Sequence, residues 1–379
     1  MIYLDNAATS FPKPPQVVRA MAGTLNRIGG NPGRAGHRIS LAGGRVLGAC
    51  RDCLAEMFRM EKPEHVIFTS NCTDSLNIAI RGSLCQGDEV IVSHSEHNAV
   101  MRVLTGYERQ GMISLKVLEP GRDGLLTPHQ LQGAIGPRTA LVVLNHASNV
   151  TGIVQPVSRL SLVCRENGVP VLIDAAQTAG VLDVSPKALN ADMVAMAGHK
   201  GLLGPHGTGV LLLGNGMLPR PFREGGTGSR SESMLQPEEL PDRYESGTMN
   251  LPGIAGLLAG ARFVAKHLWE IREYEDGLAQ RLRDNLRGID EVTLYGEEDA
   301  PKVGVVSFNI KGMESGEVAD GLDRAGFAVR GGLHCAPSIH GWLHTMDTGA
   351  VRASVGIYNT EQHMDDFVAA VAKIARGKY

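Results

Sequence analysis

The sequence predicts an α/β protein with a mainly parallel sheet covered by helices, followed by a smaller α+β unit. Between about residues 62 and 214, short runs rich in β-branched residues alternate with helical stretches. Each run is continuously apolar, which is typical of strands that are buried on both faces of a parallel sheet. After residue 252 this alternation stops and a long helical stretch begins. We therefore expect a domain boundary near residue 250.

The first unit is expected to consist of strands joined by helices, the order that a parallel sheet requires. The strands are predicted at residues 66–69, 89–93, 139–144, 169–173, 193–196 and 209–213, with helices at 74–84, from about 98 onward and at 156–167. Ligands of such sheets lie beyond the carboxyl ends of the strands. The residues that directly follow each strand are therefore the first candidates for function.

The second unit begins with a helical stretch over residues 254–286, with a break expected near Trp269. The elements after it are predicted as strands at 304–310, 328–330 and 351–355 and helices at 317–325 and 361–375. Residues 215–248 lie between the two units and are rich in Gly, Pro, Ser and Glu, which predicts a long loop.

Composition excludes several classes of protein. The 379 residues carry 37 basic and 40 acidic side chains, a net charge of −3, so no basic surface for nucleic acid is expected. No apolar run approaches the roughly 18 residues of a membrane-spanning helix. The six cysteines lack the spacing of a disulfide framework, and the N-terminus lacks the apolar stretch of a signal peptide. We therefore expect a cytoplasmic protein that binds neither nucleic acid nor membrane.

A lysine follows the predicted strand at residues 193–196. Lys200 stands between glycines, at Gly198 and Gly201, directly beyond this buried run. A desolvated lysine has a lowered pKa and forms Schiff bases with carbonyl groups. The alternative is an ordinary solvated lysine in a turn.

Other polar residues follow other strands. Asp174 ends an apolar run, where a carboxylate is costly to bury unless it is paired, although it could also cap a helix. Cys72 and Thr73 begin a predicted helix, whose N–H groups can bind an anion or simply be capped. His97 and Asn149 also lie beyond strands, and each alone would more often be structural.

The positions of these residues predict a common crevice. Residues 73, 97, 149, 174, 177 and 200 would all face the carboxyl edge of the sheet. A Schiff-base lysine, a carboxylate for a pyridine nitrogen, a helix N-terminus for a phosphate and a histidine for a ring face together match pyridoxal 5′-phosphate (PLP). The sequence therefore predicts a PLP site.

The smaller unit contains a candidate nucleophile and a candidate carboxylate-binding group. Cys335 follows a glycine-rich turn close to Arg330 and His334, and positive neighbours favour the reactive thiolate. The alternative is a small buried cysteine. Arg352 stands in an otherwise apolar run and needs a partner, for which a substrate carboxylate is well suited.

Two patterns that suggest metal binding are weak. Cys50 and Cys53 have CxxC spacing but lie in a helical pattern without a second pair. The histidines of a predicted loop, His334, His340 and His344, match no strong ligand motif. No metal site is expected.

Several motifs, taken in order, resemble those of one enzyme family. They are YLDNAA at residues 3–8, EHN at 96–98, NVTG at 149–152, DAAQ at 174–177, HK at 199–200, GT at 247–248 and RAS at 352–354. The set is similar to that of the class V aminotransferases, which are fold-type-I PLP enzymes, and within them to cysteine desulfurases and selenocysteine lyases. The resemblance spans nearly the whole chain. It implies a large domain over residues 16–250 with a seven-stranded sheet, and a small α+β domain formed by residues 1–15 and 251–379.

The resemblance also implies roles for single residues. Lys200 would hold PLP as a Schiff base and Arg352 would bind the substrate carboxylate, with Arg34 and Asn31 as further candidates. The other expected cofactor contacts are Asp174 at the pyridine nitrogen, Gln177 at the phenolic oxygen, His97 on the ring face, Cys72, Thr73 and His199 at the phosphate, and Asn149 near the ring and the substrate. The family forms homodimers, in which Thr248 would reach the phosphate bound by the partner subunit.

Cys335 would be the sulfur-accepting residue of this family. Its Arg-Gly-Gly-x-His-Cys setting is closest to that of the group II (SUF-type) cysteine desulfurases. The resemblance thus implies conversion of L-cysteine to L-alanine, a persulfide on Cys335, and transfer of sulfur to an acceptor protein, as in iron–sulfur cluster assembly. His97 would take part in proton transfer.

The chain departs from the family pattern at Ala197, at Leu333 and in the loop over residues 336–351. These departures leave other reactions open, namely selenocysteine lyase, cysteine sulfinate desulfinase, and a class V aminotransferase or epimerase. A non-catalytic phosphate-binding or sulfur-carrier module is the alternative from another functional class.

Overall fold

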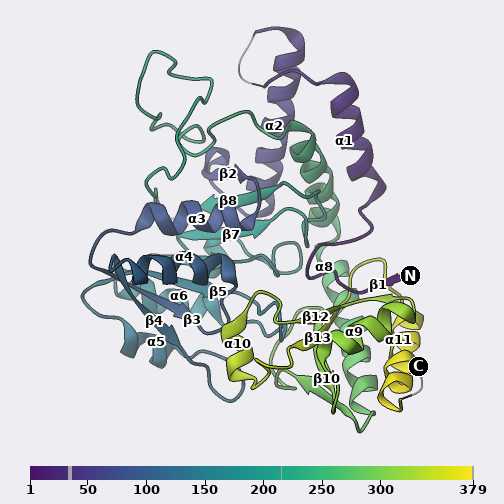
Figure 1. The fold of residues 1–379 in the computed structure, drawn as a ribbon. Coiled ribbons are helices and arrows are strands. Elements are labelled where there is room, and N and C mark those ends of the chain that lie inside the picture. The colour runs from purple at the N-terminus through teal and green to yellow at the C-terminus, as the bar shows by residue number, and fades with distance from the viewer. Residues whose placement is uncertain (33–35, 215, 378–379) are drawn as a thin grey trace.

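The computed structural model describes residues 1–32, 36–214 and 216–377 and contains three sheets (Figure 1). The largest has seven strands in the order β2-β8-β7-β6-β5-β3-β4. Their bounds are β2 Val66–Thr69, β3 Asp88–Ser93, β4 Ile113–Leu118, β5 Thr139–Asn145, β6 Val171–Asp174, β7 Met193–Ala197 and β8 Gly209–Leu213. The predicted strands and the mainly parallel sheet are thereby confirmed.

Two features of this sheet escaped the sequence prediction. Strand β8 runs antiparallel to both of its neighbours, β2 and β7, whereas all other pairs are parallel. Strand β4 was not predicted, because it is an edge strand of mixed burial that carries the half-exposed Lys116. A search for continuous apolar runs finds central strands and misses an edge strand of this kind.

Helices cover both faces of the large sheet (Figure 1). The sheet's strands alternate between two cores, so that Val90 and Val92 of β3 pack on one side and Ile91 on the other. On the first side lie α3 (Cys72–Ser83) and α4 (Asn98–Arg109). The second side is covered by α2 (Arg38–Met57), α5 (Pro128–Ala134), α6 (Val157–Glu166), α7 (Pro186–Leu189) and the first turns of α8 (Leu251–Arg287).

Helix α8 connects the two parts of the chain. Its early residues, such as Leu257, belong to the core beneath the large sheet, whereas Leu282 belongs to the core of the smaller unit. The backbone leaves helical geometry at His267, which confirms the break expected near Trp269 within two residues. The contacts of α1 (Pro15–Arg27) are mainly with α8.

The smaller unit contains a four-stranded antiparallel sheet and a two-stranded parallel one. The four strands, in spatial order, are β12 (Arg330–Gly332), β13 (Ala350–Ser354), β10 (Val305–Ile310) and β9 (Val292–Tyr295). In the second sheet β1 (Ile2–Tyr3) pairs with β11 (Phe327–Ala328). The remaining helices are α9 (Ser315–Arg324), α10 (Pro337–Trp342) and α11 (Glu361–Ala375).

The predicted strand at residues 328–330 is wrong as a single element. Ala328 ends β11 in the parallel pair, and Arg330 begins β12 in the antiparallel sheet. The chain changes sheet between them, which a run of three residues cannot reveal. Between residues 216 and 248 the structure has no helix or strand, as predicted. The division into domains at residues 1–15, 16–250 and 251–379 stays a prediction.

Within the part of the chain that the structure describes, no helix combines the length and the apolar character needed to cross a membrane.

Candidate active site

A cavity of about 220 Å³ lies beyond the carboxyl ends of the central strands. It brings together all six of the residues that the sequence placed in one crevice. Among the residues that line it are Cys72, Thr73, His97, Asn149, Asp174, Gln177, His199, Lys200 and Arg352. Side chains from distant parts of the chain therefore meet at the edge where parallel sheets bind ligands.

Lys200 lies in the turn that follows β7. Burial lowers the pKa of its amine, while the nearby Asp174 carboxylate acts in the opposite direction. The turn is closely packed, since a Cβ on Gly201 would lie 2.3 Å from the carbonyl oxygen of Ala179. The glycine beside the lysine is thus required by close backbone contact, and the lysine amine is partly desolvated.

Asp174 is the last residue of β6 and is only 3% exposed. Its Oδ1 accepts a hydrogen bond from the backbone N–H of Ala176 at 2.9 Å. The thiol of Cys72 donates to the same oxygen at 3.6 Å, and the pKa of this thiol is raised by burial and by Asp174. The Asp174 carboxylate is therefore oriented by two hydrogen-bond donors that share its Oδ1. It lines the same cavity as Lys200 and interacts electrostatically with the Lys200 amine.

The first turn of α3 contributes Cys72 and Thr73 to the cavity. Asn71 caps this helix, its side-chain oxygen accepting from the N–H of Asp74 at 2.9 Å. The turn places backbone donors at the cavity wall, where an anionic group would be stabilised. A Cβ on Gly209 of β8 would lie 2.4 Å from the backbone of Asn71, so glycine is needed where that strand passes beneath the turn.

His97 caps α4 and lines the cavity. Its Nδ1 accepts from the N–H of Ala99 at 3.0 Å, which leaves the proton of the neutral ring on Nε2. Burial lowers the pKa of His97, so the neutral ring is favoured.

Gln177 and His199 contact the N-terminal segment, here residues 7–10. Gln177 donates from Nε2 to the carbonyl of Ala7 at 3.0 Å. His199 stacks on His206 with ring centroids 5.1 Å apart, and burial lowers its pKa to about 4. The carbonyl of His199 accepts from the hydroxyls of Thr9 and Ser10, so this segment holds the turn that carries Lys200.

Several buried polar atoms at this cavity have no hydrogen-bond partner among the described residues. Asn149 donates from Nδ2 to the carbonyl of His334 at 2.7 Å, but its Oδ1 is unpaired. The same holds for Oδ1 of Asn145, Nδ1 of His199 and Nε of Arg352. Asn145 was not among the predicted site residues, although it directly follows the strand predicted at residues 139–144, where functional residues were expected. Unpaired buried groups around one cavity indicate a polar ligand.

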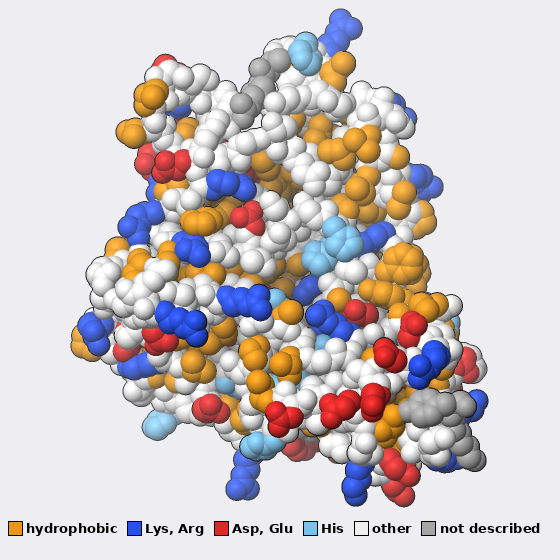
Figure 2. Space-filling view, viewed as in Figure 1, with side chains coloured by type: hydrophobic (Ala, Val, Ile, Leu, Met, Phe, Trp, Pro, Cys, Tyr) orange, Lys and Arg blue, Asp and Glu red, His pale blue; other side chains and the backbone are white. Residues whose placement is uncertain are grey.

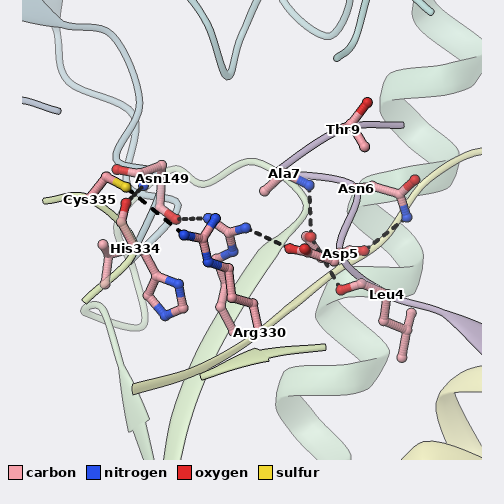
Figure 3. A network of polar contacts seen from close by, with 12 residues as sticks. Leu4, Asp5, Asn6, Ala7, Thr9, Asn149, Arg330, His334 and Cys335 are labelled. Carbon is pink, nitrogen blue, oxygen red and sulfur yellow. Dashed lines mark hydrogen bonds and ion pairs between the residues drawn. The ribbon is translucent and has the colours of Figure 1, made fainter. Parts of the chain in front are cut away.

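Arg352 is buried in β13, with its side chain 2% exposed. Its Nη2 forms an ion pair with Oδ1 of Asp5 at 2.6 Å, and its Nη1 donates to the carbonyl of Asn149 at 3.1 Å (Figure 3). Asp5 belongs to the YLDNAA motif of residues 3–8, and no role was predicted for it. Its pairing with Arg352 joins residues 347 positions apart, which strand patterns do not predict.

Cys335 is exposed and is not among the residues that line the cavity. It lies beside the cavity, because its neighbours Arg330 and His334 both belong to the lining. Nη2 of Arg330 is 3.9 Å from its Sγ, and the N–H of Asn98 donates to its carbonyl at 2.8 Å (Figure 3). The prediction of an arginine and a histidine near this cysteine is correct.

Two other predicted residues are not brought to this cavity, and a third falls outside the described residues. Thr248 and Asn31 are exposed and do not line it. Arg34 lies outside the described residues. The prediction that His334, His340 and His344 lie in a loop is wrong for His340, which is fully buried within α10.

These residues fit PLP. An amine, a carboxylate and a helix N-terminus surround one cavity, as the aldehyde, the ring nitrogen and the phosphate of PLP require. The neutral His97 and the unpaired amides of Asn145 and Asn149 add ring and polar contacts. Ala197, where the family often has a hydroxyl residue, is buried at the end of β7 and offers no side-chain donor to the cavity that it lines.

The class V aminotransferase family model matches residues 2–367 of this chain. A probable cysteine desulfurase from Methanothermobacter thermautotrophicus is 32% identical over 382 residues, covering 99% of this chain and 94% of the relative. A cysteine desulfurase from Salmonella agona is 31% identical, with coverage of 99% and 94%.

Solved structures agree with the sequence relatives. The apo cysteine desulfurase from Thermococcus onnurineus NA1 superposes with a TM-score of 0.93 at 32% identity, covering 99% of this chain and 95% of that one. The cysteine desulfurase CsdA from Escherichia coli gives a TM-score of 0.88 at 28% identity, covering 99% and 94%. The fold, the cavity and these relatives agree, and the chain belongs to the class V aminotransferase family.

Proposed function

We propose that this protein is a PLP-dependent cysteine desulfurase, which converts L-cysteine to L-alanine and retains the sulfur as a persulfide on Cys335. One observation carries the proposal: Lys200, Asp174 and Arg352 line one cavity, and Cys335 lies beside it. The relatives that are named cysteine desulfurases support the same reaction.

In this proposal the cavity residues hold PLP. Lys200 would bind its aldehyde group, Asp174 would pair with its ring nitrogen, and Gln177 would contact its phenolic oxygen. The first turn of α3, with Cys72 and Thr73, and His199 would hold the phosphate, while His97 would cover the ring and Asn149 would lie near both ring and substrate. When bound, PLP acts as an electron sink that makes the Cα proton of an amino acid acidic.

Arg352 binds the carboxylate of L-cysteine, with three N–H groups that Asp5 and Asn149 do not use. Lys200 removes the Cα proton, a role that its lowered pKa favours because a larger fraction of the amine is neutral at a given pH. His97 relays to the carbon that loses sulfur the proton that Lys200 took from Cα: Nε2 gives up its proton to the carbon and regains one from the Lys200 ammonium, so the ring ends neutral.

Cys335 takes up the sulfur. Its thiolate attacks the substrate sulfur, an S–S bond forms and the Cβ–S bond breaks. The electron pair of the broken bond stays with the carbon, which is protonated and leaves as alanine, and the substrate sulfur remains as the outer atom of the persulfide. Nη2 of Arg330 lies 3.9 Å from Sγ, so a positive charge stands beside the attacking sulfur. Since Cys335 is exposed, its turn has to bring Sγ closer to the substrate and can then present the persulfide to an acceptor protein.

The proposal includes a homodimer in the cytoplasm. Figure 2 shows hydrophobic side chains gathered over the region of α1, and exposed apolar residues there and nearby include Phe11, Val18, Leu25, Ile39 and Leu41. An exposed apolar patch of this kind is typical of an interface. Thr248 would then reach the phosphate in the partner subunit, and Arg34 would complete the substrate site. All six cysteines are free thiols, as a reducing compartment favours.

The first test is the visible spectrum of the purified protein, followed by addition of L-cysteine with a reductant and assay of sulfide and alanine. A visible PLP band with equimolar sulfide and alanine is expected. The band without either product would refute the proposed reaction and direct the assay to selenocysteine, cysteine sulfinate and amino-group transfer. Absence of the band after addition of PLP would refute the cofactor assignment.

A further inference from the structure

Arg352 is a buried cation whose charge is balanced by the N-terminal segment. Its side chain is 2% exposed, and Arg330 on the neighbouring strand β12 adds a second positive charge that disfavours its ionised state. An uncompensated buried charge is strongly destabilising. Asp5 supplies the compensating charge through the ion pair of 2.6 Å.

The backbone around Asp5 is fixed on both sides. The N–H of Leu4 donates to Ala328 at 2.9 Å, and the N–H of Ser354 donates to Leu4 at 2.7 Å. The N–H of Ala7 donates to the hydroxyl of Ser354 at 2.8 Å (Figure 3). The backbone of Asp5 is therefore held against Ser354 at the end of β13, two residues after Arg352 in the sequence.

Asp5 uses only one of the N–H donors of the Arg352 guanidinium group. An arginine has five N–H donors. Asp5 receives one through Nη2, the carbonyl of Asn149 receives one through Nη1, and Nε has no partner among the described residues. Asp5 and the carbonyl of Asn149 thus fix the plane of the guanidinium group. Its remaining N–H donors are available to another anion in the cavity that Arg352 lines.

We propose that Asp5 is a positioning residue for substrate, a resident carboxylate that orients Arg352 so that its remaining N–H groups bind the α-carboxylate of an amino acid. This inference rests on the proposed function. Without the charge of Asp5, Arg352 stands beside Arg330 with no anionic partner. The Arg352 side chain then changes its orientation, which misplaces its N–H donors, or binds an anion from solution, which competes with the substrate carboxylate.

The test compares two ligands that differ only in the carboxylate. L-Alanine, the proposed product, and ethylamine, which is alanine without its carboxylate, are titrated into the PLP-loaded protein while the visible absorbance is recorded. Asp5→Asn is expected to weaken L-alanine binding about tenfold or more, as loss of a charge-assisted contact does, and to leave ethylamine binding unchanged. The selectivity for the carboxylate is a readout that a purely structural role would not change.

A matched control is provided by Asp365. It forms an ion pair with Arg281 at the same distance of 2.6 Å, but these side chains are 37% and 40% exposed. Asp365→Asn is expected to leave both titrations unchanged. In an Arg352→Ala background, Asp5→Asn is expected to cause no further loss of alanine affinity, because Asp5 acts through Arg352.

Two results would overturn the inference: unchanged or tighter alanine binding in Asp5→Asn, or an equal loss for alanine and ethylamine. If Asp5→Asn does not fold, Asp5→Glu decides, since it keeps the charge but displaces it by one methylene. It is expected to weaken alanine binding and to spare ethylamine, and equal affinities to those of the unmodified protein would refute the role of Asp5. Failure of the unmodified protein to bind PLP or release sulfide refutes the proposed function instead, so the two failures are distinguishable.

Discussion

Asn149 links Arg352 to the turn that carries Cys335. Its carbonyl accepts from Nη1 of Arg352 at 3.1 Å, and its side-chain Nδ2 donates to the carbonyl of His334 at 2.7 Å. His334 and Cys335 both have positive φ angles, 51° and 58°, a conformation that is costly for residues other than glycine. The candidate carboxylate site and the candidate nucleophile are thus held by one asparagine.

Asn149→Ala is expected to lower kcat for sulfide release about fivefold, because the Cys335 turn loses a buried hydrogen bond that is worth about 1 kcal/mol and its strained backbone is less constrained. Sulfide and alanine are measured under saturating L-cysteine. The control is Asn167→Ala, which removes a similar amide-to-carbonyl bond of 2.8 Å at the exposed end of α6. An unchanged kcat in Asn149→Ala would contradict the positioning of the turn by this residue.

Lys200→Ala is expected to abolish the visible band of lysine-bound PLP and all sulfide release, since no other amine replaces the partly desolvated one. Absorbance spectra after incubation with PLP measure this change. Lys187→Ala removes an exposed lysine far from the cavity lining and should retain both the band and the activity. A normal band in Lys200→Ala would show that PLP binds elsewhere.

Cys335→Ser is expected to abolish release of sulfide from L-cysteine while the visible PLP band is retained, because the hydroxyl cannot accept sulfur. Cys85→Ser is the matched control, since Cys85 is also an exposed free cysteine. The same assay with selenocysteine and cysteine sulfinate separates the alternatives, as those leaving groups depart without a thiolate. Retained desulfuration of L-cysteine in Cys335→Ser would refute the proposed acceptor.

Glu96 predicts a pH dependence of stability. It is fully buried, its Oε1 accepts from Ser93 and from the N–H of Asn145, both at 2.6 Å, and burial raises its pKa to about 8 from 4.5. Below pH 4.5 the folded and unfolded states both hold the proton. As pH rises toward 8 the unfolded state loses it first, so this contribution to stability declines through that range.

Glu96→Gln is expected to fold, because its amide oxygen can accept the same two hydrogen bonds, and to show a flatter decline of the melting temperature between pH 5 and about pH 8. The decline should be reduced and not abolished, because burial also raises the pKa of Glu275 to about 8. Thermal unfolding at a series of pH values measures it. Parallel curves for the two proteins would contradict a protonated Glu96.

Local patterns were sufficient for strands that are buried on both faces and for helices with one clear apolar face. Strands β5 and β8 and helix α11 follow directly from apolar runs and caps, and the strand-end positions of His97, Asp174 and Lys200 follow from the rule that parallel strands share a functional edge. Edge strand β4 and the change of sheet between β11 and β12 were missed, because partly exposed or very short strands carry little periodic signal.

The sequence by itself determined the α/β class, the order of the strands along the chain and the chemical types of group that meet at their ends, because these depend on periodicity and on residue chemistry. Only the tertiary structure decided the pairings between distant segments. Asp5 meets Arg352, Cys72 meets Asp174, and Cys335 lies beside the cavity and not in its lining. The contact of Asp5 with Arg352 depends on how β1, β11 and β13 are placed side by side, and that of Cys72 with Asp174 on how α3 packs against the end of β6. Such placements are set by packing of the whole chain.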